Sequence, residues 1–121
     1  MKNDKNNTVP TALNLVLKCG VPPTLKGHKY LAEAIELYAD GDYSYSDLYR
    51  RIAENNDVKP KSIMRDISYA ISQGFEFTER LSELMDMPIP REQMHNALAI
   101  SYLAIKLKSQ QNEHNSQEKR E

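Results

Sequence analysis

Proline and glycine divide this chain into short segments, and that division restricts the folds it can form. Its 121 residues contain six prolines and four glycines, which stand between stretches where apolar residues recur every three or four positions. Proline is tolerated in the first turn of a helix and glycine just past its end, whereas both disturb regular structure elsewhere. The pattern therefore predicts short helices joined by tight turns.

Six helices follow from this spacing, because each stretch carries its apolar residues on one helical face. No segment alternates apolar and polar residues convincingly, as a half-buried strand does. We expect a first helix around the apolar stretch 13–17, between Pro10 and Gly20, and further helices over about residues 25–39, 46–54, 60–73, 78–85 and 91–108, the third beginning near Ser46 as its N-cap. The predicted fold class is all-α, a compact six-helix domain.

The expected organisation is one domain with polar ends. Residues 1–10 are predicted to form a flexible N-terminus, and residues 11–108 the helical domain. Residues 109–121 contain no apolar residue, so we expect a disordered tail or a fraying helix end.

Composition excludes membrane and secreted proteins. The mean hydropathy is -0.68, and no apolar run approaches the roughly 18 residues that a membrane span requires. The N-terminus lacks the apolar stretch of a secretory signal. The single cysteine, Cys19, cannot form an internal disulfide, which favours a cytoplasmic location.

Motifs for catalysis or metal binding are not found either. The three histidines, at positions 28, 95 and 114, are too scattered for a metal cluster. The chain has no glycine-rich phosphate loop and no nucleophile elbow. We therefore expect no enzymatic activity, no cofactor and no metal.

The third and fourth expected helices carry the functional signal. A helix-turn-helix needs a small residue where its helices cross and an apolar residue just after the turn. Ala53 and Val58 stand at these two places. Two amphipathic helices joined by a polar turn also occur in proteins that never touch DNA, so the pattern alone leaves both readings open.

The fourth helix places a polar face opposite its apolar one. On a helical wheel Ile63, Ile67 and Ile71 face the core, and Arg65 lies diametrically opposite. Arginine is the commonest partner of guanine in the major groove, and hydroxyl groups also suit base edges. The predicted base-reading residues are Arg65, Ser62, Ser68, Tyr69 and Met64.

Charge supports this reading locally. The whole chain has a net charge of -1, which gives no global attraction to nucleic acid. Residues 48–72, however, carry a net charge of +2. The predicted phosphate contacts are Lys59, Lys61, Arg50 and Arg51, whereas Asp66 is unfavourable unless it pairs with a cation.

Two segments, Cys19–Ile35 and Ser62–Ile71, resemble a known family. The first contains Gly-Val-Pro, Lys-Gly-x-x-Tyr-Leu and Glu-Ala-Ile in that order. These elements resemble the C-terminal effector domain of the master sporulation response regulator of endospore-forming Firmicutes, over about residues 13–108. The resemblance implies a six-helix DNA-binding domain that regulates transcription in sporulation, with a helix-turn-helix at its third and fourth helices.

The recognition helix departs from the family pattern. That helix typically reads Ser-Arg-Val-Glu-Arg-Ala-Ile-Arg-His-Ala-Ile and aligns without gaps from Lys61, so the resemblance places Arg65 at a base-contacting position. Met64, Ser68 and Tyr69 replace the family's Glu, Arg and His. The DNA site of the family is therefore not expected to carry over unchanged.

The resemblance also bears on regulation and partners. Only about a dozen residues precede the first helix, so we expect no receiver domain and no phospho-aspartate switch in this polypeptide. The family's fifth-helix region is associated with contact to the polymerase sigma subunit. Here it carries Glu76, Glu79, Glu83, Asp86 and Arg80, and a solvated helix face explains these charges equally well.

Two functions remain open. The first is a sequence-preferring transcriptional regulator that binds double-stranded DNA, with homodimers on paired half-sites because a single arginine per copy gives limited specificity. The sixth helix, with its generous apolar stripe, is the expected pairing surface. The alternative is an interaction module that dimerises with a full-length regulator or contacts the sigma subunit without binding DNA.

Overall fold

The computed structural model describes residues 11–41 and 43–120, and it describes side chains up to residue 115. Six α-helices and one 3₁₀ turn account for the regular structure of these residues, and they contain no strand. The elements are α1 (Ala12–Lys18), α2 (Lys26–Asp40), α3 (Tyr45–Asn56), α4 (Pro60–Gln73), α5 (Phe77–Met85), η2 (Arg91–Gln93) and α6 (Asn96–Arg120). The predicted all-α class is confirmed. The predicted flexible N-terminus lies outside the described residues.

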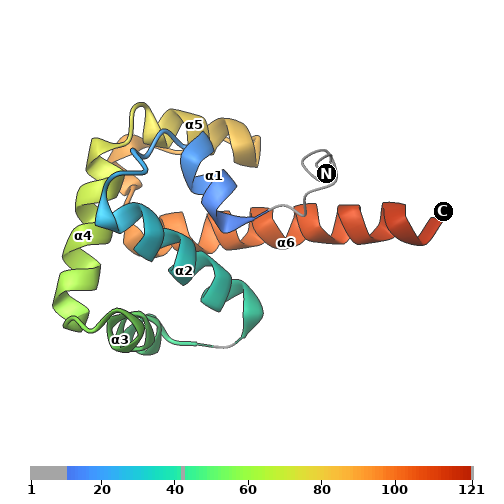
Figure 1. Ribbon diagram of the computed structural model, residues 1–121. Helices are drawn as coiled ribbons and strands as arrows, with labels where there is room; N and C mark the ends of the chain where they lie inside the picture. The colour runs from blue at the N-terminus through green and yellow to red at the C-terminus, as the bar shows by residue number, and fades with distance from the viewer. Residues whose placement is uncertain (1–10, 42, 121) are drawn as a thin grey trace.

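Helix α2 is the centre of the packing. Helices α1, α3, α4 and α6 all contact it, and Figure 1 shows it running diagonally through the body between them. Its buried face includes Leu31, Ala34 and Ile35, none of which is measurably exposed. Because burial of such side chains is the main favourable term in folding, α2 fixes the positions of these four helices.

Helix α4 approaches α2 more closely than side chains would ordinarily allow. A Cβ atom built on Gly27 would overlap the Asp66 carbonyl oxygen and lie 2.6 Å from the Cβ of Ala70. Only glycine permits this backbone approach. The N-terminal turn of α2 is therefore held directly against the middle of α4.

The predicted start of the last helix, at residue 91, is wrong. Residues 91–93 form the separate turn η2, and α6 begins at Asn96. The break arises because Met94 is extended and the His95 Nδ1 atom accepts the Leu98 backbone N–H at 3.3 Å, as an N-cap does. The N-cap of the third helix also lies two residues earlier than predicted, because the Ser44 hydroxyl rather than that of Ser46 accepts the Asp47 N–H.

Helix α6 packs one apolar face into the core of the domain. Its buried residues are Ala99, Ile100, Leu103, Ala104 and Leu107, whereas Ile105 is exposed. These buried residues lie on the face opposite the stripe expected from the sequence, Met94, Ala97, Leu98, Ser101, Tyr102 and Ile105, which is half-buried apart from the exposed Ile105, and pairing through that stripe stays a prediction. Beyond Leu107 the helix continues away from the body (Figure 1), past the end near Lys108 that periodicity predicted. Disorder of residues 109–121 stays a prediction.

Candidate nucleic-acid interface

Helices α3 and α4 are joined by the short connection 57–59, whose geometry is fixed by backbone hydrogen bonds. The Val58 N–H donates to the Ala53 carbonyl at 3.0 Å, and the Asp57 N–H donates to the Glu54 carbonyl at 3.5 Å. This pair of bonds is a Schellman motif, with Asp57 in the left-handed conformation at φ 56° where glycine is usual. Pro60 then begins α4 at a position where its missing N–H costs nothing.

Val58 follows the turn directly but does not pack into the core. Its side chain is 38% exposed, because its role in the turn is the backbone bond to Ala53 rather than core packing. Ala53 is buried as expected. The turn is therefore held by hydrogen bonds and by Ala53 more than by an apolar residue that follows it.

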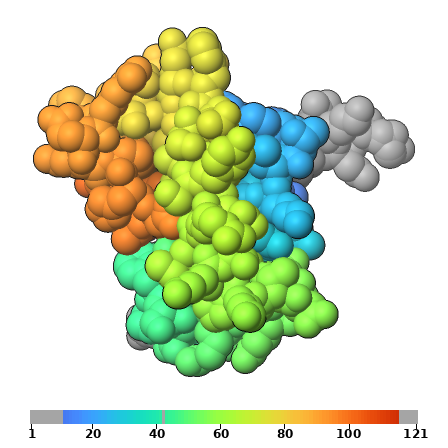
Figure 2. Space-filling view, turned by 90° about the vertical axis from the view of Figure 1, so that its left-hand side faces the viewer, coloured from blue at the N-terminus to red at the C-terminus, as the bar shows by residue number. Residues whose placement is uncertain are grey.

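Helix α4 has one buried and one solvent-facing side. Ile63, Ile67 and Ala70 are buried, and Figure 2 shows the outer side of α4 as a ridge along one face of the molecule. Of the predicted base-reading residues Arg65, Ser62, Ser68, Tyr69 and Met64, all are exposed except Ser62, which is half-buried. The structure thus brings these five side chains to one helix without covering them.

Arg65 is well exposed on that face. Its side chain is 74% exposed, and its Nε atom lies 3.8 Å from an Asp66 carboxylate oxygen. One guanidinium nitrogen is also 3.5 Å from the Ser62 hydroxyl. An exposed ion pair of this kind contributes little, about 0–1 kcal/mol, so Arg65 is held loosely and is available to a ligand.

The four predicted phosphate contacts are all exposed, but only the two lysines lie at the junction of α3 and α4, whereas the two arginines lie in the middle of α3. Lys59 and Lys61 flank the start of α4, where no side chain caps the first-turn N–H groups. Arg50 pairs with Asp47 at 2.8 Å, and the Arg51 guanidinium lies 5.0 Å from the centre of the Tyr43 ring. The two lysines are therefore less engaged than the two arginines.

Helix α6 braces this pair of helices through side chains that sequence analysis missed. The Asn96 amide donates to the Met64 carbonyl oxygen of α4 at 3.1 Å. The Tyr45 hydroxyl of α3 donates to the Ala97 carbonyl at 3.1 Å. Burial raises the pKa of the Tyr49 hydroxyl, and its hydrogen bond with Asn96 opposes that shift. No local sequence signal marks these contacts, because the partners are far apart along the chain.

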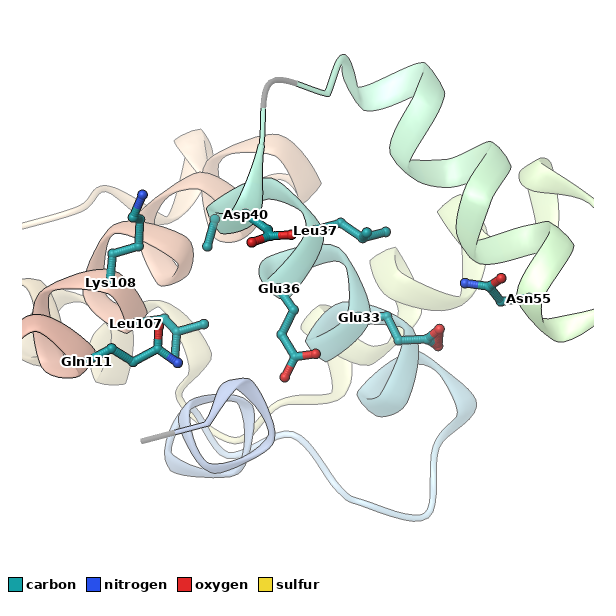
Figure 3. A pocket seen from close by; sticks show the side chains of 9 residues that line it. Glu33, Glu36, Leu37, Asp40, Asn55, Leu107, Lys108 and Gln111 are labelled. Atoms are coloured by element: carbon teal, nitrogen blue, oxygen red, sulfur yellow. The ribbon is translucent and has the colours of Figure 1, made fainter. Parts of the chain in front are cut away.

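A hollow between α2, α3 and α6 carries the opposite charge. Figure 3 shows Glu33, Glu36 and Asp40 of α2 along one side and Lys108 of α6 on the other. The Asn56 amide donates to the Glu33 carboxylate at 3.1 Å. Three carboxylates repel phosphate, and no residue of α4 lines this hollow. It does not belong to a nucleic-acid interface.

Cys19 and His28, the other residues that could carry chemistry, are both buried. Cys19 is buried, and this burial raises the pKa of its thiol to about 12 although Arg80 lowers it. His28 is buried, and desolvation lowers its pKa. Across the part of the chain that the structure describes, no group of three or more metal-ligating side chains is placed to hold an ion, and no helix is long and apolar enough to cross a membrane.

Comparison with known proteins identifies the family. Residues 12–107 match the family model described as "Sporulation initiation factor Spo0A C terminal". No curated protein matches the chain. The family match covers every helix of the packed body, including α3, α4 and the turn between them. The chain therefore belongs to the Spo0A C-terminal family of sporulation initiation factors, whose domain binds DNA and regulates transcription.

Proposed function

We propose that this domain is a sequence-preferring transcriptional regulator that reads the major groove of double-stranded DNA with α4. In this proposal α3 and α4 act as a helix-turn-helix, and the protein works in the cytoplasm, where its DNA is. The observation that carries the proposal is the outer face of α4, which is uncovered along its length and presents a 74% exposed arginine among hydroxyl groups.

The roles follow from the chemistry of each side chain. Arg65 donates two parallel hydrogen bonds to a guanine, which contributes about 1–3 kcal/mol of discrimination. Ser62, Ser68, Tyr69 and Met64 contact neighbouring base edges or the thymine methyl group. Lys59 and Lys61 hold phosphates at the uncapped start of α4, where the helix dipole also favours negative charge.

Useful specificity requires more than one copy. One bidentate arginine per domain leaves most of a binding site unread, so we propose that two domains bind paired half-sites. The pairing surface in that proposal is the side of α6 that carries the exposed Ile105, which lies opposite the side packed in the core.

Fluorescence anisotropy tests the proposal with a matched pair of arginines. Arg65 and Arg91 have side chains that are both 74% exposed, but only Arg65 lies on the outer face of α4. With a mixed-sequence duplex at about 50 mM salt, we expect binding that weakens as salt rises. Arg65→Ala should weaken it several-fold, and Arg91→Ala should not.

Two results would overturn the proposal. If the wild-type domain shows no binding at this low salt, the interaction-module function replaces it. If Arg65→Ala and Arg91→Ala weaken binding equally, the effect is one of net charge and α4 is not the reading helix. Selection of bound sequences from a random library then gives the preferred site, and Arg65→Ala should relax the preference at one base position.

A further inference from the structure

The two surfaces that flank α4 carry opposite charge. On one side is the basic flank, residues 19–32, which contains Lys26 and Lys29 and no carboxylate. On the other is the acidic flank, residues 76–93, where five carboxylates and two arginines give a net charge of -3. Figure 2 shows α4 between the start of α2 on one side and the chain leading into α6 on the other.

The basic flank adjoins the proposed reading face directly. Gly27 lies against Asp66 and Ala70 of α4, so the exposed Lys26 that precedes it stands beside the middle of that helix. The first turn of α2 has neither a side-chain cap nor an acidic residue. No carboxylate of this turn therefore competes with a phosphate for its N–H groups. Lys29 follows one helical turn later and is also exposed.

The cations of the acidic flank are already engaged. Arg91 donates to the Glu79 carboxylate at 2.6 Å, and this bond lowers the pKa of Glu79. Arg80 donates to the Lys18 carbonyl at 3.4 Å and lies over the Phe75 ring. Glu83, Asp86 and Glu92 are exposed, so this flank presents excess negative charge to solvent.

We propose that the DNA backbone beside α4 lies over the basic flank, with Lys26 as its main phosphate contact and Lys29 as a second, and that the acidic flank turns away from the duplex. Because charges are screened beyond roughly 8 Å at physiological salt, the approach of DNA is governed by these local flanks rather than by the net charge of the chain. This inference rests on the proposed function of α4.

Directed cleavage of DNA measures which flank lies near the backbone. Cys19 is buried with a thiol pKa of about 12, so a chelated iron label attaches selectively to a cysteine introduced at the surface. Three exposed positions sample the three surfaces: Thr24→Cys on the basic flank, Glu92→Cys on the acidic flank and Ser72→Cys on α4. None of them removes Lys26 or Lys29.

With a mixed-sequence duplex we expect strong cleavage from positions 24 and 72, and cleavage from position 92 several-fold weaker. Cleavage from position 92 that equals or exceeds that from position 24 would refute the inference, while cleavage from position 72 would still support reading by α4. Absence of cleavage from position 72 counts against the proposed function itself.

Two lysine variants give an independent measurement. Lys26→Gln should lower DNA affinity several-fold and reduce the slope of log affinity against log salt by about 1, as loss of one phosphate contact does. Lys108→Gln, which removes an exposed lysine from the acidic hollow at α6, should leave that slope unchanged. Equal slopes for Lys26→Gln and the wild type would contradict the assignment of Lys26.

Discussion

Helices α4 and α6 both pack against α2, but they are held there in different ways. α4 buries Ile63, Ile67 and Ala70 and meets α2 through a backbone approach at Gly27. α6 instead contributes five buried apolar residues to the core, among them Leu103 and Leu107. The position of α4 thus depends on close geometry at one point, whereas that of α6 depends on buried apolar area.

This difference means that the free energy of unfolding and the position of α4 can be changed separately. Removing apolar area from α6 lowers the free energy of unfolding but leaves the surviving folded molecules with α4 in place. Disturbing the contact at Gly27 moves α4 itself, and with it the side chains on its outer face. The two helices therefore predict two different relations between stability and DNA binding.

The largest effect on stability is expected for Leu103→Ala. Leu103 is fully buried, and truncation of such a leucine typically costs about 2–5 kcal/mol through lost transfer energy and the cavity left behind. Urea denaturation measures this loss, and Ile105→Ala, at an exposed position of the same helix, should change stability by no more than about 0.5 kcal/mol. DNA affinity per folded molecule should stay unchanged. A reduced DNA affinity of folded Leu103→Ala would show that α6 also determines the position of α4.

A smaller loss of stability, but a loss of binding, is expected for Gly27→Ala. The added methyl group overlaps the Asp66 carbonyl, and overpacking of this kind costs about 1–3 kcal/mol. Because α4 must move to accommodate it, affinity should fall even where the protein is fully folded. The control is Gly41→Ala, where the nearest atom to a new Cβ is a Tyr43 ring carbon at 3.2 Å. Unchanged affinity of folded Gly27→Ala would show that the contact does not align α4.

The smallest expected effect is a pH dependence of the free energy of unfolding. It arises from His28 in α2, the helix on which both α4 and α6 pack. Desolvation lowers the pKa of His28 below its ordinary 6.5, so the unfolded chain takes up a proton first as pH falls. The free energy of unfolding should therefore decrease from about pH 6.5 down to the folded-state pKa of His28. His28→Phe should remove this part of the pH dependence, and His95→Asn, which retains an N-cap acceptor, should keep it. A wild-type profile identical to that of His28→Phe would contradict the assignment.

Local signals in the sequence were sufficient for most of the fold. The bounds of α4 at residues 60 and 73 were predicted correctly, because Pro60 and Gly74 mark them chemically. The start of α6 was not, because the break at Met94 and His95 leaves the apolar spacing nearly unchanged and depends on a cap that forms only in the folded chain. The exchange of Ser44 for Ser46 reflects two serines that are equally suited to the position.

The candidate site was predictable in part for the same reason. Helical periodicity alone placed Arg65 on the exposed side of α4, and the structure puts it there. The brace from Asn96 to the Met64 carbonyl joins residues 32 positions apart, so only the tertiary fold reveals it. The charge difference between the two flanks was likewise present in the sequence, but its meaning depends on α4 lying between them.

The outward course of α6 has a practical consequence. Figure 1 shows α4 at one end of the body and the far end of α6 pointing away from the other. A fluorophore, an affinity handle or a tether to a surface attached beyond residue 115 would stand clear of both flanks. Immobilised chains would thus leave α4 open to solution, which suits single-molecule assays.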